Sequence, residues 1–450
     1  MENWKRIIRI GAVAIIFVFL TYVTWGKIYN PETKKIACTS RCNVILIVED
    51  ALAASHIKTY GYTRDTMPET TAFFQKNGVI FEQATAPSPW TLPSFSSVYF
   101  SDLASNISYK DLEPGNRTNL QSLLRDTGAI DVRGIVPPKS NFIYDVIEKP
   151  FQEKELTYAY KGVFAIGTDM LLKLAENKKA FFLVIHGLKI HDPYEPKPPF
   201  DTQFGSSDQY SSVSMADLRG ENLKPERVAS TTDIFALRYD QGIRQEDASI
   251  AKFLASIPPD VLANTVIIFT SDHGEAFNEH GRYWHANGLY HEELNIPLMI
   301  RGPGLISRRV QEPVSLLDLA PTILSIMQAP IPDTLLGDSL VPTLFGGSLG
   351  ERTIRFVNGF PSYLDLSPGK TPGRMNLTQT GREGTDEQLI IPTQFGVRQG
   401  DFKILTTGLH GQVQVFNLAK DPAEKNPLPI DSPAVPKSLI SQLLHMIYPL

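Results

Sequence analysis

Three runs of apolar, mostly β-branched residues stand out along the chain and predict the strands of a buried sheet. They are Asn43–Val48, Phe181–Ile185 and Thr265–Phe269. Runs that are apolar at every position are typical of strands buried on both faces of a parallel sheet. Helix-like stretches lie between them, at Asn119–Arg125, Val163–Glu176 and Asp247–Ile257. This alternation of strands and helices predicts an α/β fold with a central, mostly parallel sheet.

The amino-terminal segment has a different pattern. Lys5, Arg6 and Arg9 precede an uncharged, apolar run from Ile10 to Trp25, which approaches the roughly 20 residues that cross a bilayer. The run ends without the small-residue cleavage site of a signal peptide. We therefore expect one uncleaved transmembrane helix with its amino terminus inside, and a cleaved signal peptide as the alternative. Either way the rest of the chain is expected outside the cytoplasm, in a bacterial periplasm or at a cell surface.

Composition narrows the classes of function. The 450 residues include 43 Lys and Arg against 48 Asp and Glu, a net charge of −5, which argues against a nucleic-acid binder. The chain has 2 cysteines, Cys38 and Cys42, too few for a disulfide scaffold or a multi-cysteine zinc module. Because they are so close in sequence, we expect a local disulfide or two inert thiols.

Carboxylates and imidazoles follow each of the three predicted strands. They are Glu49 and Asp50 after the first strand, His186 and His191 after the second, and Asp272 and His273 after the third. A single aspartate after a strand is usually a helix cap or a turn residue. Three strands with such residues indicate a ligand site, because ligands of open α/β sheets bind outside the carboxyl ends of the strands. Asp and His ligands suit zinc or manganese, with magnesium and calcium as alternatives.

The third strand leads into the densest polar stretch of the chain, Ser271–Glu293. It holds four of the nine histidines, namely His273, His280, His285 and His291. A solvated loop accounts for one or two histidines but not for a cluster directly after a buried strand. We therefore predict a metal or catalytic site in this stretch.

Several blocks, in this order, resemble the sulfatase and phosphoethanolamine or phosphoglycerol transferase branch of the alkaline-phosphatase superfamily. They are Asn43–Ser94, Phe181–Tyr194, Thr265–Gly304, Val314–Leu324, Gly396–Leu405 and Val415–Glu424. The resemblance implies an alkaline-phosphatase-like three-layer αβα sandwich with a smaller C-terminal α+β subdomain. The expected domains are a membrane anchor over residues 1–28, a linker over 29–42, a catalytic domain over 43–349 and the subdomain over 350–450.

The resemblance also implies roles for single residues. The expected metal ligands are Asp50, Asp272, His273, Thr91 and, as in sulfatases, Glu49. Thr91 stands at the position of the nucleophile. His191 and His285 match two histidines that, in the transferases, bind a second metal or handle the leaving group, so all three are candidate catalytic residues. The implied cofactor is a divalent metal ion.

Departures from the sulfatase pattern decide the expected subclass. Formylglycine sulfatases carry a Cys, or sometimes a Ser, followed by x-Pro-x-Arg, whereas this chain has Thr91, Pro93 and Phe95. Threonine cannot become formylglycine, and the similar transferases use a threonine nucleophile. A second departure is Ala53 and Ser55, where relatives commonly carry Arg and Asp.

From these residues we predict a membrane-anchored, metal-dependent phosphotransferase or phosphodiesterase that acts on envelope or lipid-linked phosphoesters. Two alternatives stay open, a sulfuric-ester hydrolase and a non-catalytic envelope protein that retains the fold. The expected partners are the phosphoester substrate and the membrane, and no nucleic acid.

Overall fold

The computed structural model describes residues 36–107, 109–113, 115–137, 145–159, 162–205, 225–359, 394–407 and 412–448. The described residues from Cys38 onward form one compact unit. The strands of the central sheet are β1 (Asn43–Glu49), β2 (Gly78–Thr85), β3 (Ile130–Val136), β4 (Leu156–Tyr158), β5 (Ala180–Gly187), β6 (Thr265–Ser271), β9 (Asn295–Arg301), β10 (Arg308–Val310) and β11 (Val314–Ser315). The helices are α2 (Pro68–Asn77), α3 (Thr91–Phe100), α4 (Leu120–Asp126), α5 (Asp145–Glu148), α6 (Val163–Glu176), α8 (Pro225–Ser256), α9 (Pro259–Leu262), α10 (His291–Leu294), α11 (Leu319–Ile326), α12 (Val341–Leu344) and α13 (Lys437–Ile447).

The central sheet follows the order β10-β2-β9-β6-β1-β5-β3-β4, with β11 beside β2. Strand β1 is at its centre and pairs in parallel with β5 and with β6. Strand β9 runs antiparallel between β6 and β2. The three strands predicted from the apolar runs are therefore neighbours, and their carboxyl ends meet at one edge of the sheet.

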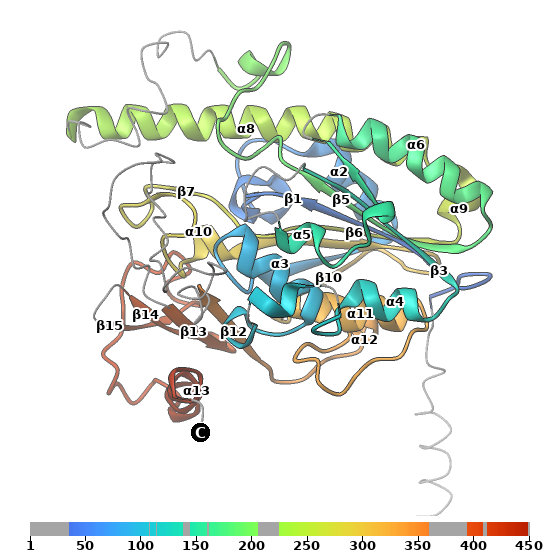
Figure 1. Cartoon of the computed structure of the whole chain (residues 1–450). Coiled ribbons are helices and arrows are strands. Elements are labelled where there is room, and N and C mark those ends of the chain that lie inside the picture. Colours follow the sequence, from blue (N-terminus) through green and yellow to red (C-terminus); the bar gives the residue numbers. More distant parts are fainter. Residues whose placement is uncertain are drawn as a thin grey trace, which may run out of the picture. The chain divides into compact units, whose positions relative to one another are not determined.

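Helices cover both faces of this sheet, as Figure 1 shows, with α2, α6, α8 and α9 on one face and α3, α4, α5, α11 and α12 on the other. Side chains alternate between the faces along a strand. Ile45 and Ile47 of β1 pack in one apolar core with residues of α8 such as Phe235 and Phe253. The expected α/β fold with a central, mostly parallel sheet and helices on both faces is confirmed.

The C-terminal region adds a second, smaller sheet. Its strands run antiparallel in the order β12 (Thr353–Asn358), β13 (Gln394–Gln399), β14 (Phe402–Thr407) and β15 (Gln412–Asn417). Helix α13 covers this sheet through Leu439 and Leu443, which pack on Val397, Ile404 and Val415. This small sheet with its helix is the expected C-terminal α+β subdomain, while the exact domain boundaries stay a prediction.

The predictions made for the amino-terminal segment have different outcomes. The predicted transmembrane helix lies outside the described residues, and no helix within the described ranges is both long and apolar enough to cross a membrane. The structure gives no support to the predicted single-pass membrane localisation, which is not carried further. Cys38 and Cys42, just before β1, form the local disulfide that was one of the two expectations.

Candidate active site

Sharp turns at the carboxyl ends of β1 and β6 bring the first acidic residues together. Ala51, directly after Asp50, has a φ of 66°, in the left-handed region. The buried hydroxyl of Tyr239 on α8 donates to the Ala51 carbonyl and accepts from the Ala53 backbone N–H. Ser94 of α3 donates to the Asp272 carbonyl at 2.6 Å. These contacts hold the loops after β1 and β6 against helices from both faces of the sheet.

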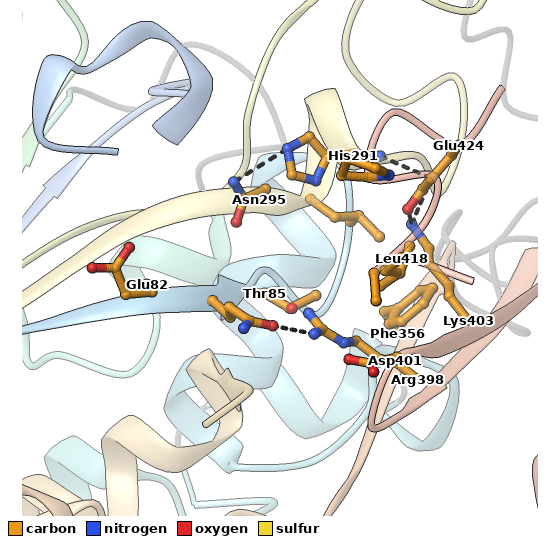
Figure 2. Close-up of a pocket in the computed structure, with 14 residues that line it drawn as sticks. Glu82, Thr85, His291, Asn295, Phe356, Arg398, Asp401, Lys403, Leu418 and Glu424 are labelled. Atoms are coloured by element: carbon orange, nitrogen blue, oxygen red, sulfur yellow. Dashed lines mark hydrogen bonds and ion pairs between the residues drawn. The ribbon is translucent and has the colours of Figure 1, made fainter. Parts of the chain in front are cut away.

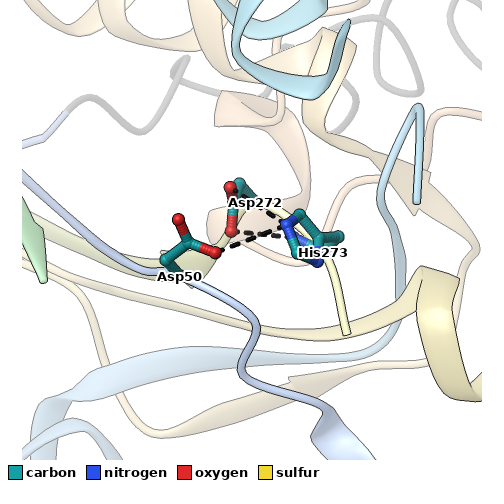
Figure 3. A group of neighbouring side chains, drawn as sticks. All are labelled: Asp50, Asp272 and His273. Atoms are coloured by element: carbon teal, nitrogen blue, oxygen red, sulfur yellow. Dashed lines mark hydrogen bonds and ion pairs between the residues drawn. The ribbon is translucent and has the colours of Figure 1, made fainter. Parts of the chain in front are cut away.

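Asp50, Asp272 and His273 form a fully buried cluster at this edge (Figure 3). Ligand atoms of the three side chains all lie within 4.8 Å of one another. The His273 Nε2 atom is 3.4 Å from Asp50 Oδ1 and 3.5 Å from Asp272 Oδ2, within ion-pair range but without hydrogen-bond geometry. Among the described residues, neither carboxylate oxygen accepts a hydrogen bond.

These unpaired oxygens show that the residues fit a metal ion. A buried carboxylate oxygen without a donor is costly unless a cation compensates it, and two carboxylates with an imidazole are a common donor set for divalent metals. Asp50, Asp272 and His273 would hold such an ion, which would supply Lewis-acid polarisation of a substrate oxygen. The donor set does not decide which metal is bound.

The charges of the cluster shift the pKa values of its members in opposite directions. Burial alone would raise the pKa of Asp50, but His191, His186 and His273 outweigh it and hold that pKa well below its usual range. Burial, followed by the neighbouring charge of Asp50, raises the pKa of Asp272. Burial opposes the charged form of His273, yet Asp272 and Asp50 raise its pKa to about 9. In the absence of a metal, the His273 imidazolium therefore partly neutralises the two carboxylates.

Thr91 lies beside this cluster. It is the first residue of α3, a position where the helix dipole favours negative charge. Its Oγ1 atom is 3.3 Å from Asp50 Oδ2 and 3.3 Å from His273 Nε2. A hydroxyl next to a candidate metal site and at a helix N-terminus is placed where deprotonation is favoured. The structure thus brings together Thr91 and three of the four other residues that were expected as metal ligands.

Glu49 does not join them. It precedes Asp50 on β1, so its side chain points to the opposite face of the sheet, the face of Ile45 and Ile47. There it lies against Gly187, where a Cβ atom would be 2.2 Å from Glu49 Oε1. Burial, reinforced by Glu246, raises the pKa of Glu49 well above its ordinary value. Strand alternation directs this side chain away from Asp50, and the expectation that Glu49 is a ligand stays a prediction.

The two other candidate histidines lie next to the cluster. The ring centroid of His285 is 4.5 Å from that of His273 and 5.0 Å from that of His191. The side chains of His191 and His285 are 20% and 18% exposed, whereas His273 is fully buried. Burial opposes the charged form of His191, but Asp50, Asp192 and Glu275 raise its pKa well above the usual value. The row of three imidazoles therefore leads from solvent to the candidate metal site.

Other polar residues of this region have different surroundings. His186 lies 3.5 Å from Asp50 Oδ2, on the inner side of the cluster. His280 lies outside the cluster, where its Nε2 atom donates to the Glu424 carbonyl and its Nδ1 atom pairs with the Glu292 carboxylate. Sequence reasoning missed Glu275, a buried residue whose Oε1 atom lies 3.0 Å from His285 Nδ1. The sequence shows that Glu275 follows His273 by two residues, but it does not show in which direction the side chain points.

A separate cavity of about 400 Å³ lies where β2, β9 and α10 meet the C-terminal sheet (Figure 2). Its walls include Arg398, which contacts Gln83, and the buried ion pair of Lys403 with Glu424. None of the candidate site residues lines this cavity. The cavity is therefore not the place of the chemistry described above.

The fold and the cluster together define an α/β sandwich with a candidate metal centre at the carboxyl edge of its sheet. A family model described as Sulfatase matches residues 42–329. The chain belongs to this sulfatase family, within the alkaline-phosphatase superfamily that the motifs resembled.

Individual relatives agree with this assignment. Arylsulfatase K of Canis lupus familiaris is 30% identical over 201 residues, which cover 39% of this chain and 37% of the relative. Arylsulfatase K of Rattus norvegicus is 25% identical over 358 residues, 73% of this chain and 57% of the relative. The chain thus spans less than two thirds of the length of these curated relatives.

Solved structures show the same fold at low identity. A phosphonate monoester hydrolase from Silicibacter pomeroyi superposes with a TM-score of 0.65 at 18% identity, covering 90% of this chain and 94% of that one. A protein solved with its substrate, D-glucosamine-2-N,6-O-disulfate, superposes with a TM-score of 0.60 at 16% identity, covering 91% and 97%.

These comparisons correct the function predicted from the sequence. The curated relatives carry the name of an arylsulfatase. They support sulfuric-ester hydrolysis, the stated alternative, over phosphotransferase or phosphodiesterase activity. The expected lipid-linked phosphoester and the membrane as a partner have no support in these findings.

Proposed function

We propose that this protein is a metal-dependent hydrolase of sulfuric esters. The observation that carries the proposal is the buried cluster of Asp50, Asp272 and His273 with the Thr91 hydroxyl 3.3 Å away. Family membership and the names of the curated relatives support sulfate as the transferred group. A sulfate monoester carries negative charge on its non-bridging oxygens, which a cationic centre at a helix N-terminus stabilises.

We further propose Thr91 as the nucleophile. In the first step the Thr91 hydroxyl loses its proton to water, and its oxygen forms a bond to sulfur while the bond from sulfur to the ester oxygen breaks, which gives sulfo-threonine and an alcohol. The leaving oxygen takes a proton from His191 or His285. In the second step water attacks the same sulfur, which releases hydrogen sulfate and restores the Thr91 hydroxyl. This route needs no formylglycine, which Thr91 cannot provide.

The roles of the other residues follow from their positions. Asp50, Asp272 and His273 would hold the divalent ion, which supplies charge stabilisation at the sulfuryl oxygens. The His191 and His285 side chains are partly exposed and close to the cluster, as proton donors to a leaving group must be. The buried position of Thr91, which is 4% exposed, limits competing reactions with water.

The test is hydrolysis of an aryl sulfate by the purified full chain, supplemented in turn with calcium, magnesium, manganese and zinc. An aryl phosphate diester serves as the competing substrate. We expect release of the phenol from the sulfate in a metal-dependent manner. Activity confined to the phosphate diester would contradict the proposal, and a metal-free protein without any hydrolytic activity would support the non-catalytic alternative.

Two variants separate the nucleophile from the rest of the site. Thr91→Ala removes the hydroxyl, and we expect its turnover to fall by roughly 10⁴-fold or more, as for other nucleophiles. Thr91→Ser keeps the hydroxyl and is the matched control, which we expect to stay within about tenfold of the wild-type rate. If Thr91→Ala retains turnover, water attacks sulfur directly and only the nucleophile assignment fails.

A further inference from the structure

Glu275 has an unusual environment for a carboxylate. It follows His273 by two residues and is fully buried. Its Oε1 atom lies 3.0 Å from His285 Nδ1. A further polar neighbour is Tyr194: burial, followed by the charge of Glu275, raises the pKa of that hydroxyl well above its ordinary value. A carboxylate that served packing alone would be replaceable by an apolar residue without this desolvation cost. The contact with His285 is therefore the feature that needs an explanation.

The chemistry of this contact fixes the form of the imidazole. An ionised carboxylate only accepts hydrogen bonds, so Nδ1 of His285 must carry the proton that it donates to Glu275. Nε2 is then left as the nitrogen that can face a substrate. The same bond restrains rotation of the ring, which lies 4.5 Å from the ring of His273, centroid to centroid. Histidines that take part in chemistry commonly have their second nitrogen held in this way.

The backbone around His285 is restrained independently. Trp284 and Ala286, on either side of it, have φ values of 65° and 66°, both in the left-handed region. Such conformations persist only where surrounding contacts enforce them. The Ala286 N–H donates to the carbonyl of Pro89, in the loop before Thr91, at 2.9 Å, and the Asn358 amide donates to the Ala286 carbonyl at 3.2 Å. The His285 loop is thus fastened to the loop that carries Thr91.

We propose that Glu275 is a positioning residue of the hydrolase site, which fixes the rotation and the tautomer of His285 so that Nε2 serves the substrate. This inference rests on the proposed function, since it assigns Glu275 to the same site. Glu275 does not touch substrate itself in this scheme and acts only through His285.

The chain offers a matched control in the same polar stretch. Glu292 is also buried, and its Oε1 atom lies 2.7 Å from His280 Nδ1. The Nε2 atom of His280 is already bonded to the Glu424 carbonyl at 2.9 Å, and its ring stacks on Tyr290. This second carboxylate–histidine pair therefore has the same chemistry but no free nitrogen. Loss of the Glu292 carboxylate should therefore lower the free energy of unfolding and leave turnover per folded molecule unchanged.

The kinetic experiment compares Glu275→Ala, Glu275→Gln, His285→Ala and the double variant Glu275→Ala/His285→Ala, with Glu292→Ala as control, all in the full chain with equal metal content. We expect kcat on the aryl sulfate to fall roughly 10- to 100-fold in Glu275→Ala, with KM changed little. Glu275→Gln should recover most of this loss because its amide oxygen still accepts from Nδ1. The double variant should be no slower than His285→Ala, and a further loss in the double variant would overturn the proposal.

A second measurement is independent of activity. In ¹⁵N-histidine-labelled full chain, the ring nitrogen shifts of His285, assigned with His285→Ala, report which nitrogen carries the proton. We expect protonated Nδ1 in the wild type and a mixture of tautomers in Glu275→Ala. A wild-type ring protonated at Nε2 alone overturns the inference. If the wild type fails to hydrolyse aryl sulfate but shows the expected shifts, the proposed function is wrong and the positioning role of Glu275 stands.

Discussion

Two groups of buried charges in this protein are built in opposite ways. In the C-terminal region, Lys403 donates to both carboxylate oxygens of Glu424, at 2.7 and 2.9 Å. The two side chains balance in charge, and Glu424 also accepts from the His291 backbone N–H. At the strand ends, Asp50 and Asp272 are like charges, and one oxygen of each, Asp50 Oδ1 and Asp272 Oδ2, lacks a hydrogen-bond donor among the described residues.

This difference in charge balance distinguishes a structural ion pair, Lys403 with Glu424, from a candidate binding site, Asp50 with Asp272. A buried ion pair with its hydrogen bonds made has no remaining need for a ligand. Two buried carboxylates that repel each other, compensated only in part by the neighbouring histidines, do need one. The protein maintains this arrangement through contacts of the surrounding loops, which is the pattern expected where function opposes stability. Four predictions test this contrast, in order of decreasing effect.

The largest effect is expected for Asp272→Asn. Turnover should fall by roughly 10³- to 10⁴-fold, since a bound cation supplies several kcal/mol of charge stabilisation. Metal content measured on the purified protein should fall with it. In metal-free protein, however, the free energy of unfolding should not decrease, because the variant removes the repulsion from Asp50.

Asp247→Asn is the matched control for this variant. Asp247 is also fully buried, but it accepts the backbone N–H groups of Glu69 and Thr70 at the start of α2. We expect it to lose stability and to keep metal content and turnover. If Asp272→Asn behaved like this control, the cluster would be structural.

The opposite result is expected for Lys403→Met. Removing one partner leaves Glu424 buried without its cation, which typically costs about 3–5 kcal/mol. Urea unfolding measures this loss, while turnover per folded molecule should stay unchanged. The double variant Lys403→Met/Glu424→Met should recover much of the stability, because apolar residues of similar size replace the pair. Failure of the double variant to recover would mean that Lys403 contributes mainly through other contacts, such as that with Phe356.

A smaller effect on turnover is expected for His191→Ala. Its position beside His285 fits a proton donor, a role that typically contributes 10²- to 10⁴-fold, and His285 can replace it in part, so we expect roughly 10²-fold. Steady-state kinetics on an aryl sulfate measure this loss. His445→Ala, on the exposed side of α13, is the control and should be neutral. Metal content should be retained in both variants, and its loss in His191→Ala would make His191 a ligand instead.

The smallest expected effect is a pH-dependent loss of stability when the pair of His280 and Glu292 is broken. Burial alone would lower the pKa of His280, but Glu292 raises it, so the stabilisation is complete below the ordinary value of 6.5 and is lost as pH rises through the raised pKa. Burial alone would raise the pKa of Glu292, but His280 lowers it, so its contribution is complete above 4.5 and is lost as pH falls through the lowered pKa. Glu292→Gln should therefore destabilise most between about pH 4.5 and 6.5.

Urea midpoints of wild type and Glu292→Gln, measured from pH 4 to pH 9, test this window. A difference between the two proteins that does not change with pH would show that the pair contributes through packing rather than charge.

Much of the architecture was readable from the sequence. Uniformly apolar runs determined β1, β5 and β6, since only strands buried on both faces require such runs. The same runs located Asp50, Asp272 and His273 at one sheet edge, because parallel strands end together. Motif order gave the family, whereas the prediction of a phosphoester substrate, drawn from Thr91 and Phe95 in the nucleophile motif, was wrong. These local departures did not outweigh the similarity of the longer chain to arylsulfatases.

Only the tertiary structure decided the directions of side chains and the contacts between distant loops. The sequence placed Glu49 and Asp50 side by side, but strand geometry sends them to opposite faces, so one joins the cluster and the other lies against Gly187. The family resemblance related His191 to His285, but the sequence gave no reason to connect Glu275 with His285. Such pairings depend on the turn after each strand and on the backbone conformation at Trp284 and Ala286. Those features arise from packing among segments far apart in the chain, which a local pattern of residues does not encode.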